Sequence, residues 1–280
     1  MRILTTISGI LLSFALCSCG AGTCGRYASP QTQVITERYA VNILRGSGTE
    51  TPEPSCIEIR KEGVPVFSKE GFYFHIGSIA QGDTETLEST DITGDGRADL
   101  VISEYTGGAH CCLLLHIFKL EPKFRYIQSI NAKHSNVYFQ NLDADPALEL
   151  VMQDWTFAYW NTAFAESPAP EVILKYNGGN YAVSPELMWT PPPGTKELDE
   201  IAAGIESSPD WHDTPKKVPV TLWAEMLDLI YTGNMSQAWI LFEISWPKEV
   251  SGKQEFLNAF KAQLESSPFW KDIRILNRGG

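Results

Sequence analysis

An acidic loop followed by an apolar strand occurs twice in this chain, fifty residues apart. The segment DITGDGRADLVISEYT begins at Asp91, and NLDADPALELVMQDWT begins at Asn141. Repeats of this length are typical of the blades of β-propellers. Because two copies cannot supply the roughly four to eight blades that close a propeller, the repeat predicts an open antiparallel β-meander or an incomplete propeller-like array.

Short runs of β-branched and aromatic residues, separated by turn signals, fill residues 33–189. Examples are VPVFS, GFYFHIGSI and EVILKY, and such runs predict antiparallel strands. The NGG between EVILKY and NYAVS predicts a hairpin. With 43% hydrophobic residues, the chain has enough apolar material to form a core.

The pattern becomes helical after a stiff, proline-rich break at residues 190–194. Residues 195–276 then carry apolar side chains at helical spacing. We expect a helical hairpin region that covers the sheet. The predicted fold class is therefore mainly β with a C-terminal α region.

The first acidic loop carries oxygen-bearing side chains at alternate positions, which is the pattern of a wrapped cation site. Hard cations such as Ca²⁺ take about six to eight oxygen ligands in a flexible geometry. Gly94 and Gly96 permit the positive φ angles that wrapping demands. An EF-hand is excluded because Ile102 stands where that motif needs a bidentate glutamate. The predicted Ca²⁺ ligands are the side chains of Asp91, Thr93, Asp95 and Asp99 and the carbonyl of Arg97.

The alternative for the first loop is a solvated turn without an ion. Its three carboxylates repel one another unless a cation neutralises them, so the sequence favours the ion. In the second loop Pro146 replaces the loop glycine and fixes φ, which argues against the same wrapped turn. We favour a structural turn there and leave ion binding open for the second set of candidate ligands, Asn141, Asp143, Asp145 and Glu149.

The motif D-x-T-G-D-G-x-x-D-L-V at residues 91–101 resembles the calcium loop of FG-GAP/VCBS repeats, the blade unit of integrin-type propellers. The resemblance is specific over this motif and loose over residues 70–190. It implies that Ca²⁺ binds between blade strands and stabilises the fold, while ligand binding takes place elsewhere. Thr93 stands where the family usually has Asp or Asn, and it should weaken the site.

The N-terminal segment MRILTTISGILLSFALCSCG has a basic start, an apolar run and then small residues. This is the pattern of a secretion signal, since the apolar run is too short to span a bilayer comfortably. The stretch from Leu16 to Cys19 resembles a bacterial lipobox. The resemblance implies that residues 1–18 are a signal peptide, that Cys19 is lipidated, and that residues 19–32 form a tether. We expect a lipoprotein anchored in the bacterial cell envelope, at the outer membrane facing the periplasm; ordinary secretory cleavage is the alternative.

Four cysteines remain beyond the signal and the lipidation site: Cys24, Cys56, Cys111 and Cys112. An even number in an oxidising compartment predicts disulfides, and the pairing stays open. A vicinal Cys111–Cys112 bond is one form. Because two cysteines follow His110, a zinc or thiol site is the alternative, although adjacent cysteines on a strand project in opposite directions.

The formal net charge of −12 argues against a nucleic-acid partner, because phosphate binding needs basic patches. The sequence therefore predicts a binding or structural module for a protein or glycan ligand. Trp155, Phe157 and Tyr159 alternate along an expected strand and could form a sugar-stacking platform, with core packing as the alternative. One competing function is an envelope enzyme, which would use a divalent metal at the acidic loop or a thiol or metal site at the His-Cys-Cys segment. Another is an assembly factor that docks through its helices.

Overall fold

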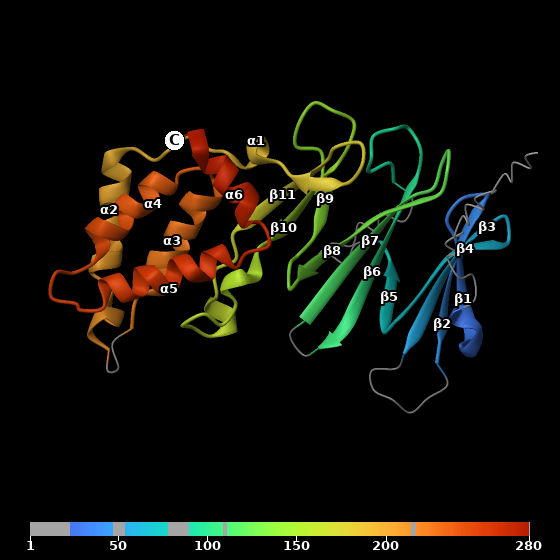
Figure 1. Cartoon of the computed structure of the whole chain (residues 1–280), viewed down its shortest axis with the longest axis horizontal. Helices are drawn as coiled ribbons and strands as arrows, with labels where there is room; N and C mark the ends of the chain where they lie inside the picture. The colour runs from blue at the N-terminus through green and yellow to red at the C-terminus, as the bar shows by residue number, and fades with distance from the viewer. Residues whose placement is uncertain (1–22, 47–53, 78–89, 109–110, 214–216, 280) are drawn as a thin grey trace, which may run out of the picture.

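Three antiparallel sheets of four strands follow one another along the chain, and a helical region completes it (Figure 1). The computed structural model describes residues 23–46, 54–77, 90–108, 111–213 and 217–279. The predicted fold class, mainly β with a C-terminal α region, is confirmed. The described strands form no closed barrel, in agreement with an open array of meanders.

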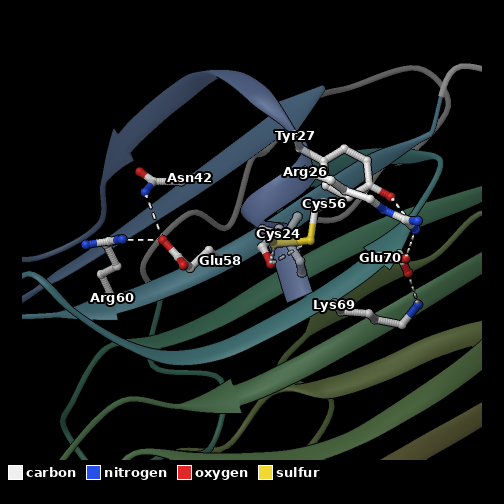
Figure 2. Close-up of a disulfide and its surroundings, with 10 residues drawn as sticks. Cys24, Arg26, Tyr27, Asn42, Cys56, Glu58, Arg60, Lys69 and Glu70 are labelled. Atoms are coloured by element: carbon white, nitrogen blue, oxygen red, sulfur yellow. Dashed lines mark hydrogen bonds and ion pairs between the residues drawn. A yellow bond between two sulfur atoms is a disulfide. The ribbon is translucent and has the colours of Figure 1, made fainter. Parts of the chain in front are cut away.

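The first sheet pairs its strands in chain order. They are β1 (Ala28–Val34), β2 (Tyr39–Arg45), β3 (Ser55–Lys61) and β4 (Val64–Gly71). A short 3-10 turn, η1 (Thr23–Arg26), precedes them, and Figure 2 shows its Cys24 bonded to Cys56 of β3. The tether predicted over residues 19–32 is therefore wrong from residue 23 onward, because the disulfide and the pairing of β1 with β2 hold this segment in the sheet.

The second and third sheets each correspond to one copy of the sequence repeat. In both, the acidic loop runs directly into the second strand. The predicted NGG hairpin is confirmed, since Tyr176 pairs with Tyr181 around Gly178, whose φ is +86°. The second sheet contains β5 (Tyr73–Ile76), β6 (Asp99–Gly108), β7 (Cys111–Lys119) and β8 (Arg125–Lys133). The third contains β9 (Tyr138–Gln140), β10 (Glu149–Gln153), β11 (Glu171–Tyr176) and β12 (Tyr181–Val183).

The helical region is larger than the expected hairpin. Helices α3 and α4 form a hairpin that turns at Gly233, whose φ is +82°, and α2 and α6 pack against it. None of the helices in the described ranges is both long and apolar enough to cross a membrane. The α-helices are α1 (Pro185–Met188), α2 (Thr195–Glu206), α3 (Val220–Tyr231), α4 (Met235–Ser245), α5 (Lys253–Glu265) and α6 (Trp270–Leu276). The further 3-10 turns are η2 (Trp155–Phe157), η3 (Phe164–Glu166), η4 (Pro209–His212) and η5 (Asn277–Gly279).

Two hydrophobic cores connect these units, and the second sheet contributes to both. Leu100 and Ile102 of β6 face a core shared with the first sheet. Val101, between them, faces a core shared with the third sheet and the helices, where Leu150 and Trp223 are buried. Burial on both faces explains the continuous apolar run after the first acidic loop. The two acidic loops consequently lie at a junction between packed sheets.

Candidate metal centre at the paired acidic loops

The two acidic loops touch each other, which the sequence did not predict. The N–H of Leu148 donates to the carbonyl of Ile92 at 3.0 Å. A Cβ placed on Gly94 would lie 2.5 Å from the backbone nitrogen of Ala147, so the two backbones meet without an intervening side chain. The Tyr181 hydroxyl donates to the carbonyl of Ile92 at 2.8 Å and lies 3.1 Å from that of Leu148. The loops of two different sheets therefore form one site.

The first loop wraps around Asp91. Its carboxylate accepts hydrogen bonds from the N–H groups of Asp95 at 3.0 Å and Gly96 at 2.6 Å. Gly94 and Gly96 have φ of +73° and +79°, as the sequence predicted. Arg97 donates its N–H to Asp95 at 3.1 Å. The loop's own backbone thus satisfies both oxygens of Asp91.

The second loop, which contains Pro146, closes with a different set of hydrogen bonds. Asp143 accepts from the N–H of Asp145 at 2.9 Å, and Asp145 accepts from the N–H of Ala147 at 2.8 Å. Proline removes the N–H that Gly96 donates in the first loop, and Asn141 instead donates its side-chain amide to the carbonyl of Asp145 at 2.8 Å. The wrapped turn of the first loop does not form here, as expected from Pro146, because no residue of the second loop has a positive φ. Bonds from backbone N–H groups to the side chains of Asp143 and Asp145 close the loop instead.

Three acidic side chains converge in this second loop. Asp143, Asp145 and Glu149 each offer an oxygen, and these oxygens lie within 4.8 Å of one another. Across the described residues, no other group of three acidic, histidine or cysteine side chains converges as closely. The acidic side chains of the first loop do not converge in this way. These three residues could hold a metal ion. The geometry thus favours the loop that the sequence ranked second.

Each loop ends in a buried carboxylate with one unpartnered oxygen. Asp99 and Glu149 are 1% and 0% exposed, and each accepts a hydrogen bond from its loop, from the N–H of Thr93 at 2.9 Å and of Leu142 at 2.8 Å. The other oxygens, Asp99 Oδ1 and Glu149 Oε1, have no hydrogen-bond partner. Burial raises the pKa of Asp99 to about 6, although the hydrogen bonds from Thr93 oppose this shift. A buried, unpaired carboxylate oxygen costs free energy, and a cation would satisfy it.

A lysine lies at each loop. Lys119 Nζ is 2.9 Å from Asp95 Oδ2, and Lys175 Nζ contacts Asp143 and lies 2.5 Å from Asp145 Oδ2. Burial pushes the pKa of Asp95 upward, but Lys119 and Arg97 together outweigh it and the pKa falls below its ordinary value. The hydrogen bond to Lys175 lowers the pKa of Asp143, and that to Asp143 raises the pKa of Lys175. The loops therefore carry partial internal charge compensation.

The cysteine side chains that the structure describes form disulfides, as the sequence predicted. Cys24 pairs with Cys56, which settles the pairing of these two. Cys112 is also disulfide-bonded, so it offers no free thiol for a nucleophile or a zinc ligand. Cys19, His110 and the side chain of Cys111 lie outside the described part of the structure.

A Glu–His–Tyr chain in the second sheet, with Glu104 and His116 buried, was missed by the sequence reasoning. Glu104 Oε2 accepts hydrogen bonds from His116 Nε2 at 2.8 Å and from Lys69 of β4 at 2.7 Å. Because the carboxylate places the imidazole proton on Nε2, the Tyr126 hydroxyl donates to His116 Nδ1, at 3.0 Å. Burial pushes the pKa of Glu104 upward, but its hydrogen bonds to His116 and Lys69 hold it below its ordinary value. This chain ties the second sheet to the first.

The equivalent position of the second repeat, Asp154, ties the third sheet to the helices. Its Oδ2 accepts hydrogen bonds from the hydroxyl of Tyr231 in α3, at 2.6 Å, and from Ser267. Its Oδ1 accepts from the N–H of Thr156 at 2.9 Å. Both buried acids directly follow the apolar run in the aligned repeat, which is the signal that could have identified them.

The proposed aromatic strand at residues 155–159 does not form. The third sheet's strand ends at Gln153, and Trp155 and Phe157 lie in the 3-10 turn η2. Phe157 is buried against Phe260, whereas Trp155 stacks on Phe164 with ring centroids 5.0 Å apart. Core packing therefore accounts for Phe157.

A cleft of about 590 Å³ lies between β8, β12 and α6. Its wall includes Ile130, Lys133, Tyr181, Phe269 and Asp272. Because the Tyr181 hydroxyl also bonds to the first acidic loop, the cleft is structurally connected to the candidate metal centre.

Comparison of this chain with family models, with curated proteins and with solved structures gives no match. The resemblance of the first loop to the FG-GAP/VCBS calcium loop consequently rests on the motif itself.

Proposed function

We propose that this protein is a lipid-anchored cell-envelope module whose paired acidic loops bind Ca²⁺ and thereby stabilise a ligand-binding β region. The observation that carries the proposal is the unpartnered oxygen of Glu149, which is fully buried beside Asp143 and Asp145. A cation there would neutralise three converging carboxylates and satisfy the buried oxygen. The donor set contains only oxygen, which suits a hard cation and disfavours zinc or copper.

The metal is tested by titrating Ca²⁺ into metal-stripped protein by calorimetry and by following the melting temperature. Saturation to about 100 times Kd should stabilise the protein by about 2.7 kcal/mol. Asp145→Asn should weaken binding at least tenfold while keeping the side chain's shape. Asp199→Asn, at an exposed site in α2, is the matched control and should bind as the wild type does. Absence of both heat and a melting shift in the wild-type protein would refute the metal.

The membrane address is supported by the lipobox-like stretch that ends at Cys19. Several acyl chains on one cysteine give stable anchoring, which a single chain does not. Palmitate labelling and membrane fractionation test it: Cys19→Ser should abolish the label and release the protein from the membrane fraction. Unchanged labelling of this variant would show that Cys19 is not the lipidated residue.

The ligand-binding part of the proposal concerns the cleft between β8, β12 and α6. Its volume falls within the range of small-ligand pockets, and its wall combines apolar and charged side chains. We infer that it accepts a short segment of an envelope glycan or protein. Soluble oligosaccharide and peptide probes should bind the wild type, and Ala182→Trp, which fills the cleft wall, should abolish binding. Binding that survives this substitution would place the ligand elsewhere.

A further inference from the structure

In each repeat, a lysine from the next strand reaches into the acidic loop. Lys119 of β7 is paired with Asp99 in the sheet register. The pairing of Leu150 with Leu174 places Lys175 of β11 opposite Glu149 in the same way. Two lysines at equivalent positions of two repeats indicate a feature of the repeat and not an isolated surface ion pair.

The two ammonium groups occupy corresponding places among the loop oxygens. Lys119 Nζ lies 3.3 Å from Thr93 Oγ1 and 2.9 Å from Asp95 Oδ2. Lys175 contacts Asp143 and Asp145, which are the residues that align with Thr93 and Asp95. In the second loop these are two of the three acidic residues that converge.

The lysine of the second loop leaves its site incomplete. It contacts Asp143 and Asp145, yet the buried oxygen Glu149 Oε1 has no hydrogen-bond partner. A divalent ion held by all three carboxylates would satisfy that oxygen. The ion and the ammonium cannot share the same carboxylate oxygens, because the ion's ligands lie only about 2.3–2.6 Å from it and two cations at that range repel strongly.

We propose that Lys175 is the resident counter-ion of the metal-free second loop and that a divalent cation displaces it. The inference rests on the proposed metal binding and specifies its regulation: metal affinity is set by competition with Lys175, and loading releases this side chain. Lys175 is 31% exposed and has a route into solvent. Lys119 is only 17% exposed and stays in the first loop, which lacks three converging carboxylates.

The direct test is chemical acylation of lysines in the full-length wild-type protein, with and without Ca²⁺, read by mass spectrometry. Ca²⁺ should raise the labelling rate of Lys175 several-fold and leave that of Lys119 unchanged. Unchanged or slower labelling of Lys175 under conditions where calorimetry shows Ca²⁺ binding would overturn the exchange and leave the metal site standing.

The second test is calorimetric titration of Ca²⁺ into Lys175→Met, with Lys119→Met as the matched control. Loss of the competing charge should tighten Ca²⁺ binding by Lys175→Met at least about tenfold, and lower its melting temperature in chelator. Lys119→Met should change the Ca²⁺ affinity much less. An equal gain in affinity in both variants would overturn the exchange, because it would show that removing any nearby positive charge has the same effect. Binding by Lys175→Met but not by the wild type supports the exchange, whereas no binding by either protein refutes the metal as well.

Discussion

Replacing Gly94 and Gly96 by alanine separates loop conformation from loop pairing. Both glycines have positive φ, at +73° and +79°, which costs an alanine about 1–2 kcal/mol. At Gly96 nothing lies within 4 Å of the added Cβ, so Gly96→Ala should lose only this amount of stability. Gly96→Ala is therefore the matched control for Gly94→Ala.

At Gly94 the added Cβ would meet the backbone of the other loop. It would lie 2.5 Å from Ala147 N and 2.8 Å from the carbonyl carbon of Pro146, and neither atom can rotate away. The loops must separate, which adds about 1–3 kcal/mol for overpacking and about 1 kcal/mol for the bond from Leu148 to Ile92. We expect Gly94→Ala to lose about 3–6 kcal/mol of unfolding free energy.

Urea denaturation in chelator, followed by far-UV circular dichroism, measures both variants. All eight tryptophans lie at or after Trp155, so their fluorescence does not report on the first two sheets. Circular dichroism covers the whole β region. If Gly94→Ala proved no less stable than Gly96→Ala, the two loops would not pack backbone to backbone, and the single paired site would be refuted.

Three further predictions concern the ties between units. Glu104→Gln should lower the stability near pH 7. Because the folded-state pKa of Glu104 is below its ordinary value, the difference from wild type should be full above about pH 4.5 and shrink as the pH falls below it, towards the lowered folded-state pKa. A constant difference in urea midpoints between pH 7 and pH 3.5 would contradict this. Replacing Cys24 and Cys56 by serine opens a link between residues 32 apart and should cost about 4 kcal/mol in denaturant titrations, an expectation that equal midpoints would exclude. Tyr231→Phe removes a 2.6 Å hydrogen bond to buried Asp154 and should cost about 1–3 kcal/mol, read by tryptophan fluorescence; an unchanged transition would mean that this bond does not hold the helices to the sheet.

Local features of the fold could be predicted from the sequence because each depends on neighbouring residues. The repeat at Asp91 and Asn141 marks the second and third sheets, and the turn at Gly178 is where the hairpin was expected. Helical spacing likewise identified residues 195–276 as the helical region, where α2 to α6 lie. Where a long-range bond decides, the prediction was wrong: Cys24 is held by Cys56, so the tether ends earlier than composition indicated.

The candidate site was predicted only in part, because some of its contacts come from other parts of the chain. Asp143 and Asp145 were recognised as candidate ligands, but their partner Lys175 belongs to a strand about thirty residues further along the chain. Pro146 was rightly expected to prevent the wrapped turn, because no residue of the second loop has a positive φ. The acidic side chains converge all the same, in a loop closed by N–H groups that proline does not remove. The contact between Gly94 and the second loop is invisible in the sequence, because it depends on how two sheets pack.

The buried acids at equivalent positions of the two repeats specify which unit packs on which sheet. Glu104 accepts hydrogen bonds from donors of β4 and β7, whereas Asp154 accepts them from hydroxyls of the helical region. An alternative arrangement of these sheets would bury a carboxylate without its partners, which costs several kcal/mol. Apolar faces alone would not make this distinction, because Leu100 and Leu150 lie in cores of similar chemistry. The repeat therefore supplies the common strand pattern, and its divergent acids determine the order of the array.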